Sequence, residues 1–578
     1  MTGPPASANS PAVLELQDVS LQLGAGADEQ TLLSEVSAQF PRGHLIALLG
    51  PSGCGKSTLL KVIAGLFQQS VGNVKWEGRD LAKESDLDPH EIGYVPQFSI
   101  AYERLTVWEN LQAALQLRIG NLSSEEVKAR IEEILTAVGL KSIEERAVSV
   151  LSGGQRRRLA LALELLSSPH LLLCDEVTSG LDPKAEDEIV HLMQSIASTG
   201  NRLVINVTHS LRHLSLHDSV LVLYHGNVAY HGAPESLFHY FGVDDPEELF
   251  PRLSMRRPEE WHRSWLKHRA AYYLALNIDA SAAAPPAEEP HASPLPSMFS
   301  QFLVLLTRRW KLFFRDRGQL LLHLALLFGF PLLVVLFAMK GLPVLPSPSG
   351  ADSRDFISQM MLAAETREQF VRTGTLVSGL VMFQVILLAL MGANSSAREI
   401  ASERLIFEKE KFAGLQPIAY VASKIVFLGI LVVAQSLWMA AFVNWFVRFP
   451  GSFGDQATLL VLVNAAITSV CLGLSSLLRT PEQASLVSIY LVGFQLPLSG
   501  AVLALPEWLA PIARPAIASY WGWSGFIDTM KDYRYYEAVK LVTETPLSAS
   551  PLCLWFLLSH VILGFVLTLV GCKASRWE

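Results

Sequence analysis

Charged residues are scarce in this sequence. Asp, Glu, Lys and Arg make up only 17% of its 578 residues, while hydrophobic residues make up 50% and the mean hydropathy is +0.31. That balance excludes an ordinary soluble enzyme and favours membrane spans. The net charge of -8 and the lack of a basic arm with interleaved aromatic residues argue against a nucleic-acid partner. The chain is also too long for one domain, so we expect at least two.

Cysteine is rare, and no two cysteines have C-x-x-C spacing. Neither a zinc site nor a disulfide framework is therefore supported. The five cysteines are Cys54, Cys174, Cys471, Cys553 and Cys572. The first 12 residues are rich in Pro, Ala and Ser and have no apolar core, which excludes a signal peptide. We expect residues 1–12 to be disordered and the first half of the chain to remain in the cytoplasm.

One nine-residue stretch matches the phosphate-binding loop G-x-x-x-x-G-K-[ST]. It consists of Gly50, Pro51, Ser52, Gly53, Cys54, Gly55, Lys56, Ser57 and Thr58. An apolar run of strand length precedes it, and a helical run follows it, which is the context that the motif requires. Backbone N–H groups at the start of such a helix point at a phosphate chain. We expect Lys56 to reach the β- and γ-phosphates of ATP and the Ser57 hydroxyl to bind Mg²⁺.

Five further motifs follow in order, at the ends of apolar runs, at the start of a helix or in a turn. The first strand ends at Gln97, the second in Asp175-Glu176 and the third at His209. Between the first two lies Leu-Ser-Gly-Gly-Gln, followed by a long helical run, and after Glu176 comes a Ser-Gly-Leu-Asp turn. The residues of these two motifs that we assign to the nucleotide site are Ser152, Gly153, Gly154, Gln155 and Asp182.

This order of motifs resembles that of the ATPases of ABC transporters, over about residues 13–242. The resemblance implies an α/β P-loop NTPase fold, for which we predict a cytoplasmic domain at 13–279. It also implies that Asp175 holds Mg²⁺ through water and that Gln97 senses both Mg²⁺ and the attacking water. Glu176 would accept a proton from that water or orient it, and His209 would contact the γ-phosphate.

The Leu-Ser-Gly-Gly-Gln segment begins a helix, so its N–H groups and the helix dipole favour an anion. In the family, that anion is the γ-phosphate bound by the other subunit. Many such ATPases stack the adenine on an aromatic residue near the first strand. Residues 16–23 contain none, so we name no residue for adenine recognition.

The second half of the chain is predicted to be an all-α membrane domain. A Pro/Ala-rich linker occupies 280–296, and 297–318 holds a basic amphipathic helix suited to the cytoplasmic membrane surface. Six uncharged runs of spanning length follow in the region 319–578. They are Leu320–Met339, Thr373–Ala393, Ile425–Val447, Ala457–Leu478, Ala484–Ala504 and Leu552–Cys572. The basic residues of the loop at 395–424 place that loop inside, with the ATPase.

An ATPase followed by six spans resembles the G (White-type) subfamily of ABC transporters, whose membrane domain is of the ABC-2 type. The ATPase motifs differ in detail from the animal pattern and suggest a bacterial relative. The segment 403–410 resembles the coupling segment of that family. Because its substrate cavity lies between the second and fifth spans of two subunits, we assign Phe383, Gln384 and Gln495 to the substrate.

We therefore predict a half-transporter in the cytoplasmic membrane that pairs with a second copy of itself. It would use ATP and Mg²⁺ to export an unknown small-molecule or lipid-like substrate. Three alternatives stay open. The chain could export a lipid or glycan specifically, or it could be an ATP-driven regulator or envelope-remodelling protein without a transported substrate. It could also pair with a different cassette protein, although the intact set of motifs favours a homodimer.

Overall fold

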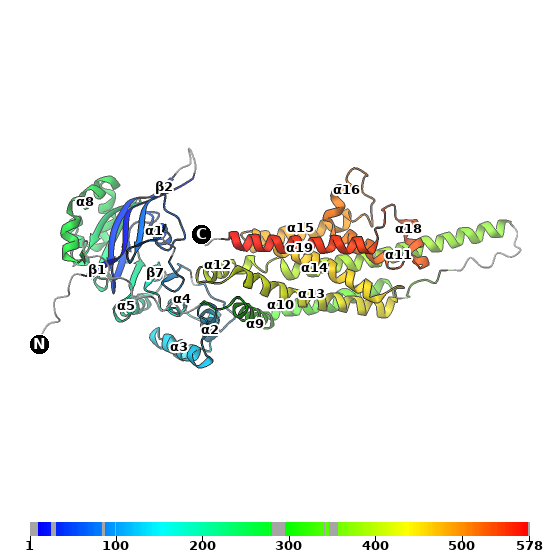
Figure 1. The fold of residues 1–578 in the computed structure, drawn as a ribbon, viewed down its shortest axis with the longest axis horizontal. Coiled ribbons are helices and arrows are strands. Elements are labelled where there is room, and N and C mark those ends of the chain that lie inside the picture. The colour runs from blue at the N-terminus through cyan, green and yellow to red at the C-terminus, as the bar shows by residue number, and fades with distance from the viewer. Residues whose placement is uncertain are drawn as a thin grey trace. The chain divides into compact units, whose positions relative to one another are not determined.

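The computed structural model describes residues 10–24, 30–83, 87–98, 100–276, 278–279, 295–339, 341–345 and 356–575. The chain divides into two compact units (Figure 1). The first comprises residues 1–300, 409–415 and 576–578, and the second comprises 301–408 and 416–575. The first unit is α/β and the second is helical, as the sequence predicts.

The first unit contains two sheets in the described part of the chain. One is mainly antiparallel and is built from β1 (Ser10–Leu23), β2 (Gln30–Pro41), β4 (Val71–Trp76), β5 (Arg79–Asp80) and β11 (Ile278–Asp279). The other has the order β10-β9-β3-β8-β7-β6. Its strands are β3 (Leu45–Leu49), β6 (Ile92–Val95), β7 (Leu171–Asp175), β8 (Leu203–Val207), β9 (Ser219–Tyr224) and β10 (Asn227–Gly232).

The second of these sheets determines where the motifs lie. Strands β3, β8, β7 and β6 are neighbours and all run parallel. Each is buried along its whole length, as a parallel strand covered on both faces should be. Their carboxyl ends therefore meet at one edge, and the phosphate-binding loop, Gln97, Asp175-Glu176 and His209 each lie at or just beyond the end of one of these strands.

Helices surround the sheets of this unit. They are α1 (Lys56–Ile63), α2 (Val107–Arg118), α3 (Ser124–Ala137), α4 (Gly153–Leu165), α5 (Pro183–Gly200), α6 (Pro234–Phe241), α7 (Leu249–Ser254) and α8 (Pro258–Ala275). Capping boxes start three of them, at Thr106, Ser123 and Ser152. Such a box satisfies two orphan backbone groups, which explains why these helices begin where they do.

The domain boundary at 279 stays a prediction, but an aromatic cluster places α8 in the core of the first unit. Trp261 and Trp265 of α8 are 3% and 1% exposed and belong to the same core as Tyr230 of β10 and Phe241 of α6. The final strand β11 pairs with the start of β1. Because β1 begins at Ser10, the predicted disorder of residues 10–12 is wrong; residues 1–9 lie outside the described residues, as does most of the predicted linker, 280–294.

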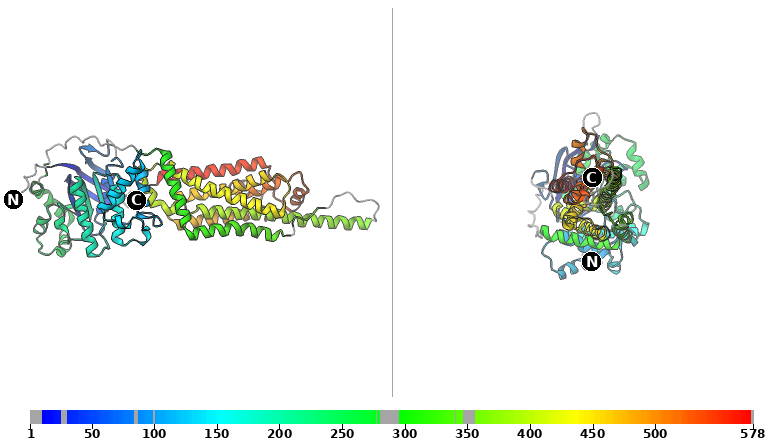
Figure 2. Two further views of the ribbon diagram at one scale, coloured as in Figure 1. Left: turned by 90° about the horizontal axis from the view of Figure 1, so that it is seen from below. Right: turned by 90° about the vertical axis from the view of Figure 1, so that its right-hand side faces the viewer.

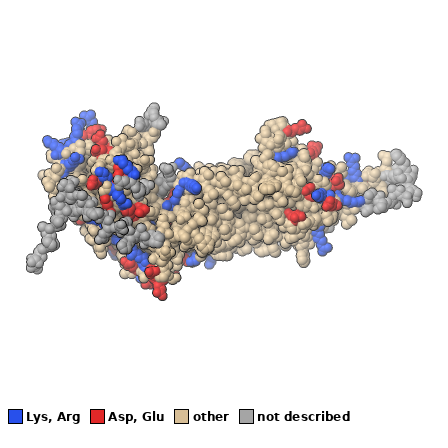
Figure 3. Space-filling view, in the orientation of Figure 1, with Lys and Arg blue, Asp and Glu red and all other residues tan. Residues whose placement is uncertain are grey.

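The second unit is a helical bundle (Figure 2). Its helices are α9 (Met298–Arg315), α10 (Arg317–Phe337), α11 (Phe356–Ser396), α12 (Arg404–Phe412), α13 (Pro417–Val447), α14 (Phe453–Leu477), α15 (Pro481–Leu498), α16 (Ala510–Ala513), α17 (Ala518–Asp528), α18 (Arg534–Val542) and α19 (Ser550–Ala574). The first three residues of α9 and the end of α12 belong to the first unit. On the face shown in Figure 3, the middle of the bundle is almost free of charged residues, as a lipid-facing surface should be.

Among the described residues, five helices are long and apolar enough to cross a membrane, and they correspond to predicted spans one to four and six. The fifth run was predicted as Ala484–Ala504, but its helix α15 ends at Leu498 and is not one of those five. α15 has one narrow buried stripe, Ala484, Ser488, Val492 and Gln495, with apolar side chains exposed around it. α15 therefore packs against the bundle along one side and is shorter than the predicted span.

The predicted amphipathic helix is present as α9, and two of its arginines are buried. Arg308 and Arg309 are 6% and 7% exposed, whereas Phe299 and Phe314 are 67% and 61% exposed. The guanidinium of Arg309 donates two hydrogen bonds to Glu399, which also accepts from Lys424 at 2.9 Å. Leu305 and Phe313 are buried as well, whereas Lys311 and Arg315 are exposed, so basic and apolar residues occur on both the buried and the exposed sides of α9.

Candidate functional site

The predicted catalytic residues follow three adjacent strands. Gln97 lies just beyond β6, Asp175 ends β7 with Glu176 next, and His209 lies two residues beyond β8. The phosphate-binding loop follows β3, the next strand in the sheet. Ligands of open α/β sheets bind outside the carboxyl ends of the strands. Residues that are up to 159 positions apart, from Gly50 to His209, are therefore brought to one edge.

The phosphate-binding loop is held by its own lysine. Nζ of Lys56 donates to the carbonyl oxygens of Gly50 at 2.8 Å and Pro51 at 2.9 Å, and the side chain is only 5% exposed. Gly55 caps α1 with φ 104°, and a Cβ there would lie 2.8 Å from the Leu32 carbonyl oxygen. Only glycine fits that position. The arrangement places an ammonium and free helix-start N–H groups where phosphate would bind.

Two of the predicted Mg²⁺ ligands are in direct contact. The Ser57 hydroxyl donates to Oδ1 of Asp175 at 2.8 Å, and Tyr94 donates to Oδ2 at 3.1 Å. Burial raises the pKa of Asp175 above its usual range, partly offset by these two hydrogen bonds. A buried carboxylate beside a hydroxyl is a hard-oxygen donor set that a divalent cation would stabilise. The side chains therefore fit Mg²⁺. Tyr94 was not predicted from the sequence, because nothing marks a strand tyrosine as a partner.

Glu176 lies between the other two predicted residues. Nε2 of Gln97 donates to Oε2 of Glu176 at 2.9 Å, and Nε2 of His209 lies 2.9 Å from Oε1. A carboxylate only accepts, so the His209 proton is on Nε2. The backbone of Glu176 has φ 50°, a left-handed conformation that is uncommon for non-glycine residues and recurs at functional sites. Gln97, Glu176 and His209 thus form one hydrogen-bonded group, which we call the carboxylate clamp.

The start of α4 has the form expected for an anion site. Ser152 and Gln155 form a capping box in which Ser152 N donates to Oε1 of Gln155 at 3.0 Å. The N–H groups of Gly153 and Gly154 lie in the first helical turn, where they have no partner within the helix. A Cβ at Gly154 would meet the Cβ of Ala185 on α5 at 3.3 Å, so glycine permits close packing there.

Asp182 is the N-cap residue of α5. Its carboxylate caps α5 by accepting from the N–H groups of Lys184 and Ala185 at 3.1 and 3.0 Å. It therefore sets the start of the helix that packs beside α4. Its contact with nucleotide stays a prediction.

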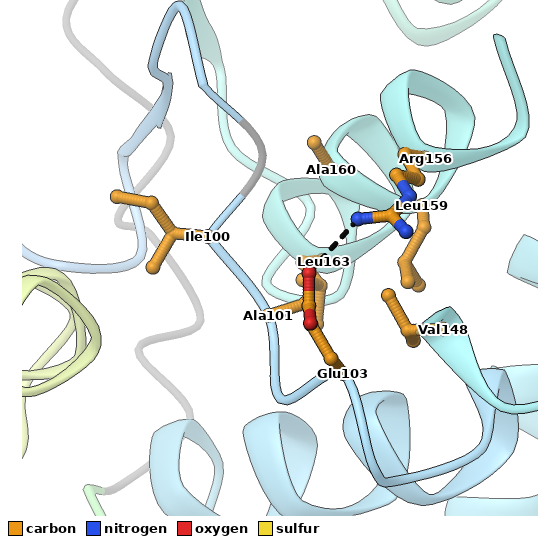
Figure 4. Close-up of a pocket in the computed structure, with 8 residues that line it drawn as sticks. All are labelled: Ile100, Ala101, Glu103, Val148, Arg156, Leu159, Ala160 and Leu163. Carbon is orange, nitrogen blue, oxygen red and sulfur yellow. Dashed lines mark hydrogen bonds and ion pairs between the residues drawn. The ribbon is translucent and has the colours of Figure 1, made fainter. Parts of the chain in front are cut away.

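Two cavities of the first unit lie apart from these motifs. A small one of about 20 Å³ lies where Arg156 of α4 binds Glu103 at 3.1 Å (Figure 4). The other, of about 620 Å³, is lined by residues such as His90, Arg130 and His170. Neither is lined by the phosphate-binding loop or by the clamp.

The three predicted substrate residues lie in the second unit. Gln384 is 1% exposed and donates to the Leu380 carbonyl of its own helix at 3.5 Å. Gln495 is 3% exposed and accepts from the N–H of Ser519 at 3.0 Å, which helps to position α17. Phe383 is half-buried with its ring 5.8 Å from that of Phe337. Both glutamines form hydrogen bonds to the backbone of the same chain. Contact of these three residues with substrate stays a prediction.

Two family models match the chain. Residues 33–179 match the ABC transporter model, and residues 300–522 match the ABC-2 type transporter model. The first match spans β3, β6, β7 and the start of α4, and the second begins in α9 and ends in α17. Their order along the chain is the order predicted from the motifs.

The relatives include an ATP-binding/permease protein and separate ATP-binding proteins. An ABC transporter ATP-binding/permease protein of Mycobacterium tuberculosis is 30% identical over 493 residues, covering 82% of this chain. The chain spans only 53% of the length of that relative. A sulfate/thiosulfate import ATP-binding protein of Burkholderia pseudomallei is 33% identical over 276 residues, covering 47% of this chain and 78% of that protein. One from Synechococcus elongatus is 37% identical over 226 residues, covering 39% of this chain and 64% of that protein.

Proposed function

Because the chain belongs to the ABC transporter family and joins the ATPase to an ABC-2 type membrane domain, we propose that it is an ATP-driven exporter acting as a homodimer. The family assignment makes it a multi-pass membrane protein with its ATPase in the cytoplasm. Export, rather than import, is our proposal. The importer ATP-binding proteins among its relatives match less than half of the chain, whereas the ATP-binding/permease relative matches 82% of it.

The observation that carries the proposal is the convergence at one sheet edge of Lys56, Asp175 and the carboxylate clamp. Lys56 supplies positive charge for the β- and γ-phosphates, and Ser57 with Asp175 would hold Mg²⁺, which neutralises phosphate charge. Both kinds of group stabilise charge that develops as the γ-phosphoryl group is transferred.

The clamp supplies the proton chemistry. Water attacks the γ-phosphorus, the bond from that phosphorus to the bridging oxygen of ADP breaks, and Glu176 accepts the proton that the water loses. Each oxygen of Glu176 accepts one hydrogen bond in the clamp, so lone pairs remain on both oxygens to accept the proton of the water. His209 would donate its Nε2–H to the γ-phosphate instead of to Glu176 once the phosphate is bound. The clamp therefore holds Glu176 in position for the attacking water.

We propose that the second copy completes each site. The helix-start N–H groups of Gly153 and Gly154 would bind the γ-phosphate held by the partner. Each dimer would then contain two equivalent sites, in the twofold arrangement that is commonest among oligomers. The proposed substrate is amphipathic or lipid-like, and Phe383, Gln384 and Gln495 are its proposed contacts.

Transport can be tested in proteoliposomes of phosphatidylethanolamine and phosphatidylglycerol that contain a fluorescent NBD-labelled lipid. ATP added outside acts on cassettes that face outward. An exporter should then move NBD-lipid into the inner leaflet, where external dithionite cannot quench it. A parallel assay should follow uptake of the amphipathic dye rhodamine 6G. Normal ATP hydrolysis without movement of either probe would contradict export of this class of substrate and favour the regulatory alternative.

The proposed orientation makes a separate prediction. Gln369 of α11 and Ser402 are both exposed, but they flank opposite ends of the second span. A cysteine at Gln369 should react with a membrane-impermeant maleimide added to whole cells, whereas a cysteine at Ser402 should react only after the cells are lysed. The unmodified chain is the control, because its five cysteines are all buried. The opposite labelling pattern would reverse the orientation.

A further inference from the structure

Three consecutive arginines follow the capping box of α4, and they have different partners. Arg156 donates to the carbonyl oxygens of Leu151 at 3.2 Å and Ser149 at 2.9 Å, besides its bond to Glu103. Arg158 donates to the carbonyl of Val138 and to Glu188. Successive residues of a helix point about 100° apart, so the three side chains leave α4 in three directions.

Arg157 reaches the clamp. Its Nη1 donates to the backbone carbonyl oxygen of Gln97. Burial lowers the pKa of Arg157 from its ordinary value, and the nearby negative charge of Glu176 opposes that shift. The guanidinium is thus partly withdrawn from water next to the catalytic carboxylate. Arg157 therefore binds the backbone of Gln97, and the side-chain Nε2 of Gln97 in turn donates to Oε2 of Glu176 at 2.9 Å.

We propose that Arg157 is a positioning residue that links the start of α4 to the carboxylate clamp of the same chain. This inference rests on the proposed function. Gly153 and Arg157 are four residues apart on one helix, which is about 6 Å along its axis. A γ-phosphate bound by the N–H groups at the helix start belongs to the partner's site. A shift of α4 on binding it would therefore move Arg157 and, through the Gln97 backbone, the clamp of the chain's own site.

The first test replaces Arg157 in both subunits. Arg157→Gln should lower kcat for ATP about tenfold, the effect expected from one charge-assisted hydrogen bond, while the Kd for the fluorescent analogue mant-ATP changes less than about twofold. Arg157→Lys keeps the charge and should recover part of the loss. The matched control is Arg158→Gln, which removes a neighbouring arginine that does not contact Gln97 and should leave kcat unchanged. A normal kcat in Arg157→Gln would overturn the inference, as would an equal loss in Arg158→Gln.

The second test asks in which subunit Arg157 acts, using mixed dimers purified through two affinity tags. One subunit carries Glu176→Gln, so that only the other subunit has a working carboxylate. Arg157→Gln in the subunit with the working Glu176 should lower the remaining activity about tenfold. Placed in the subunit that already carries Glu176→Gln, it should have little further effect. The reverse pattern would show that Arg157 acts across the dimer and would overturn the inference. A complete lack of ATP hydrolysis by the unmodified dimer would instead refute the proposed function itself.

Discussion

Replacing Glu176 with glutamine should reduce ATP turnover at least a hundredfold, the usual scale for loss of a general base. An amide cannot take the proton from the attacking water, although it has nearly the shape of the carboxylate. Binding should be retained, because the phosphate contacts come from Lys56 and the helix starts. Turnover is measured by phosphate release and binding by mant-ATP fluorescence. We expect the variant to remain dimeric in ATP, since the bound nucleotide is not consumed.

Glu188 supplies the control for that experiment. It is a carboxylate of α5 that pairs with Arg158 and is not part of the clamp. Glu188→Gln should leave turnover within about twofold of the unmodified chain, because surface ion pairs contribute little. Turnover by Glu176→Gln equal to that of the control would show that Glu176 is not the general base.

Replacing Lys56 with alanine should instead weaken ATP binding by roughly 10- to 100-fold, since a hydrogen bond to a charged group contributes about 1.5–3 kcal/mol. The loss should exceed that of a surface lysine, because Lys56 is 5% exposed and also joins the carbonyl oxygens of Gly50 and Pro51. The measurement is a mant-ATP titration, with ATP competition to confirm the site.

Lys61 lies one turn further along α1 and contacts the ring of Phe67 rather than the loop carbonyls. Lys61→Ala is therefore the matched control and should bind mant-ATP with nearly unchanged affinity. Equal affinities for the two variants would mean that Lys56 does not contact the phosphates. The assignment of the phosphate-binding loop would then fail.

The sequence was sufficient to place the strand ends to within two residues, because the runs before Gln97, Asp175 and His209 are short and mostly apolar. It could not show that Gln97 and His209 bind the two oxygens of one carboxylate. Those bonds join residues 79 and 33 positions apart, and they depend on the order of strands in the sheet. The role of Arg157 is hidden for the same reason, since three adjacent arginines look alike in a sequence.

In the membrane unit, the lengths of the helices could not be predicted from the sequence. A search for uncharged runs starts the second span at Thr373, but α11 already begins at Phe356. The extra turns contain Glu365, Arg367, Glu368 and Arg372, which a hydropathy criterion rejects although a helix outside the bilayer tolerates them. Hydropathy also overestimated α15, whose helix ends at Leu498, one residue beyond Pro497. Hydropathy therefore measures compatibility with lipid and not the length of a helix.

The aromatic cluster under α8 has a practical consequence for producing the ATPase by itself. The motifs predict a resemblance to other cassettes only to about residue 242, so an ATPase fragment for expression could be ended there. A chain ending there would lose Trp261 and Trp265 and would uncover Tyr230 and Phe241, which are 0% and 1% exposed in the intact unit. It would also free the edge of β1 that β11 occupies, and uncovered aromatic surface beside an open strand edge promotes aggregation. Soluble yield should therefore depend on continuing the clone through residue 279.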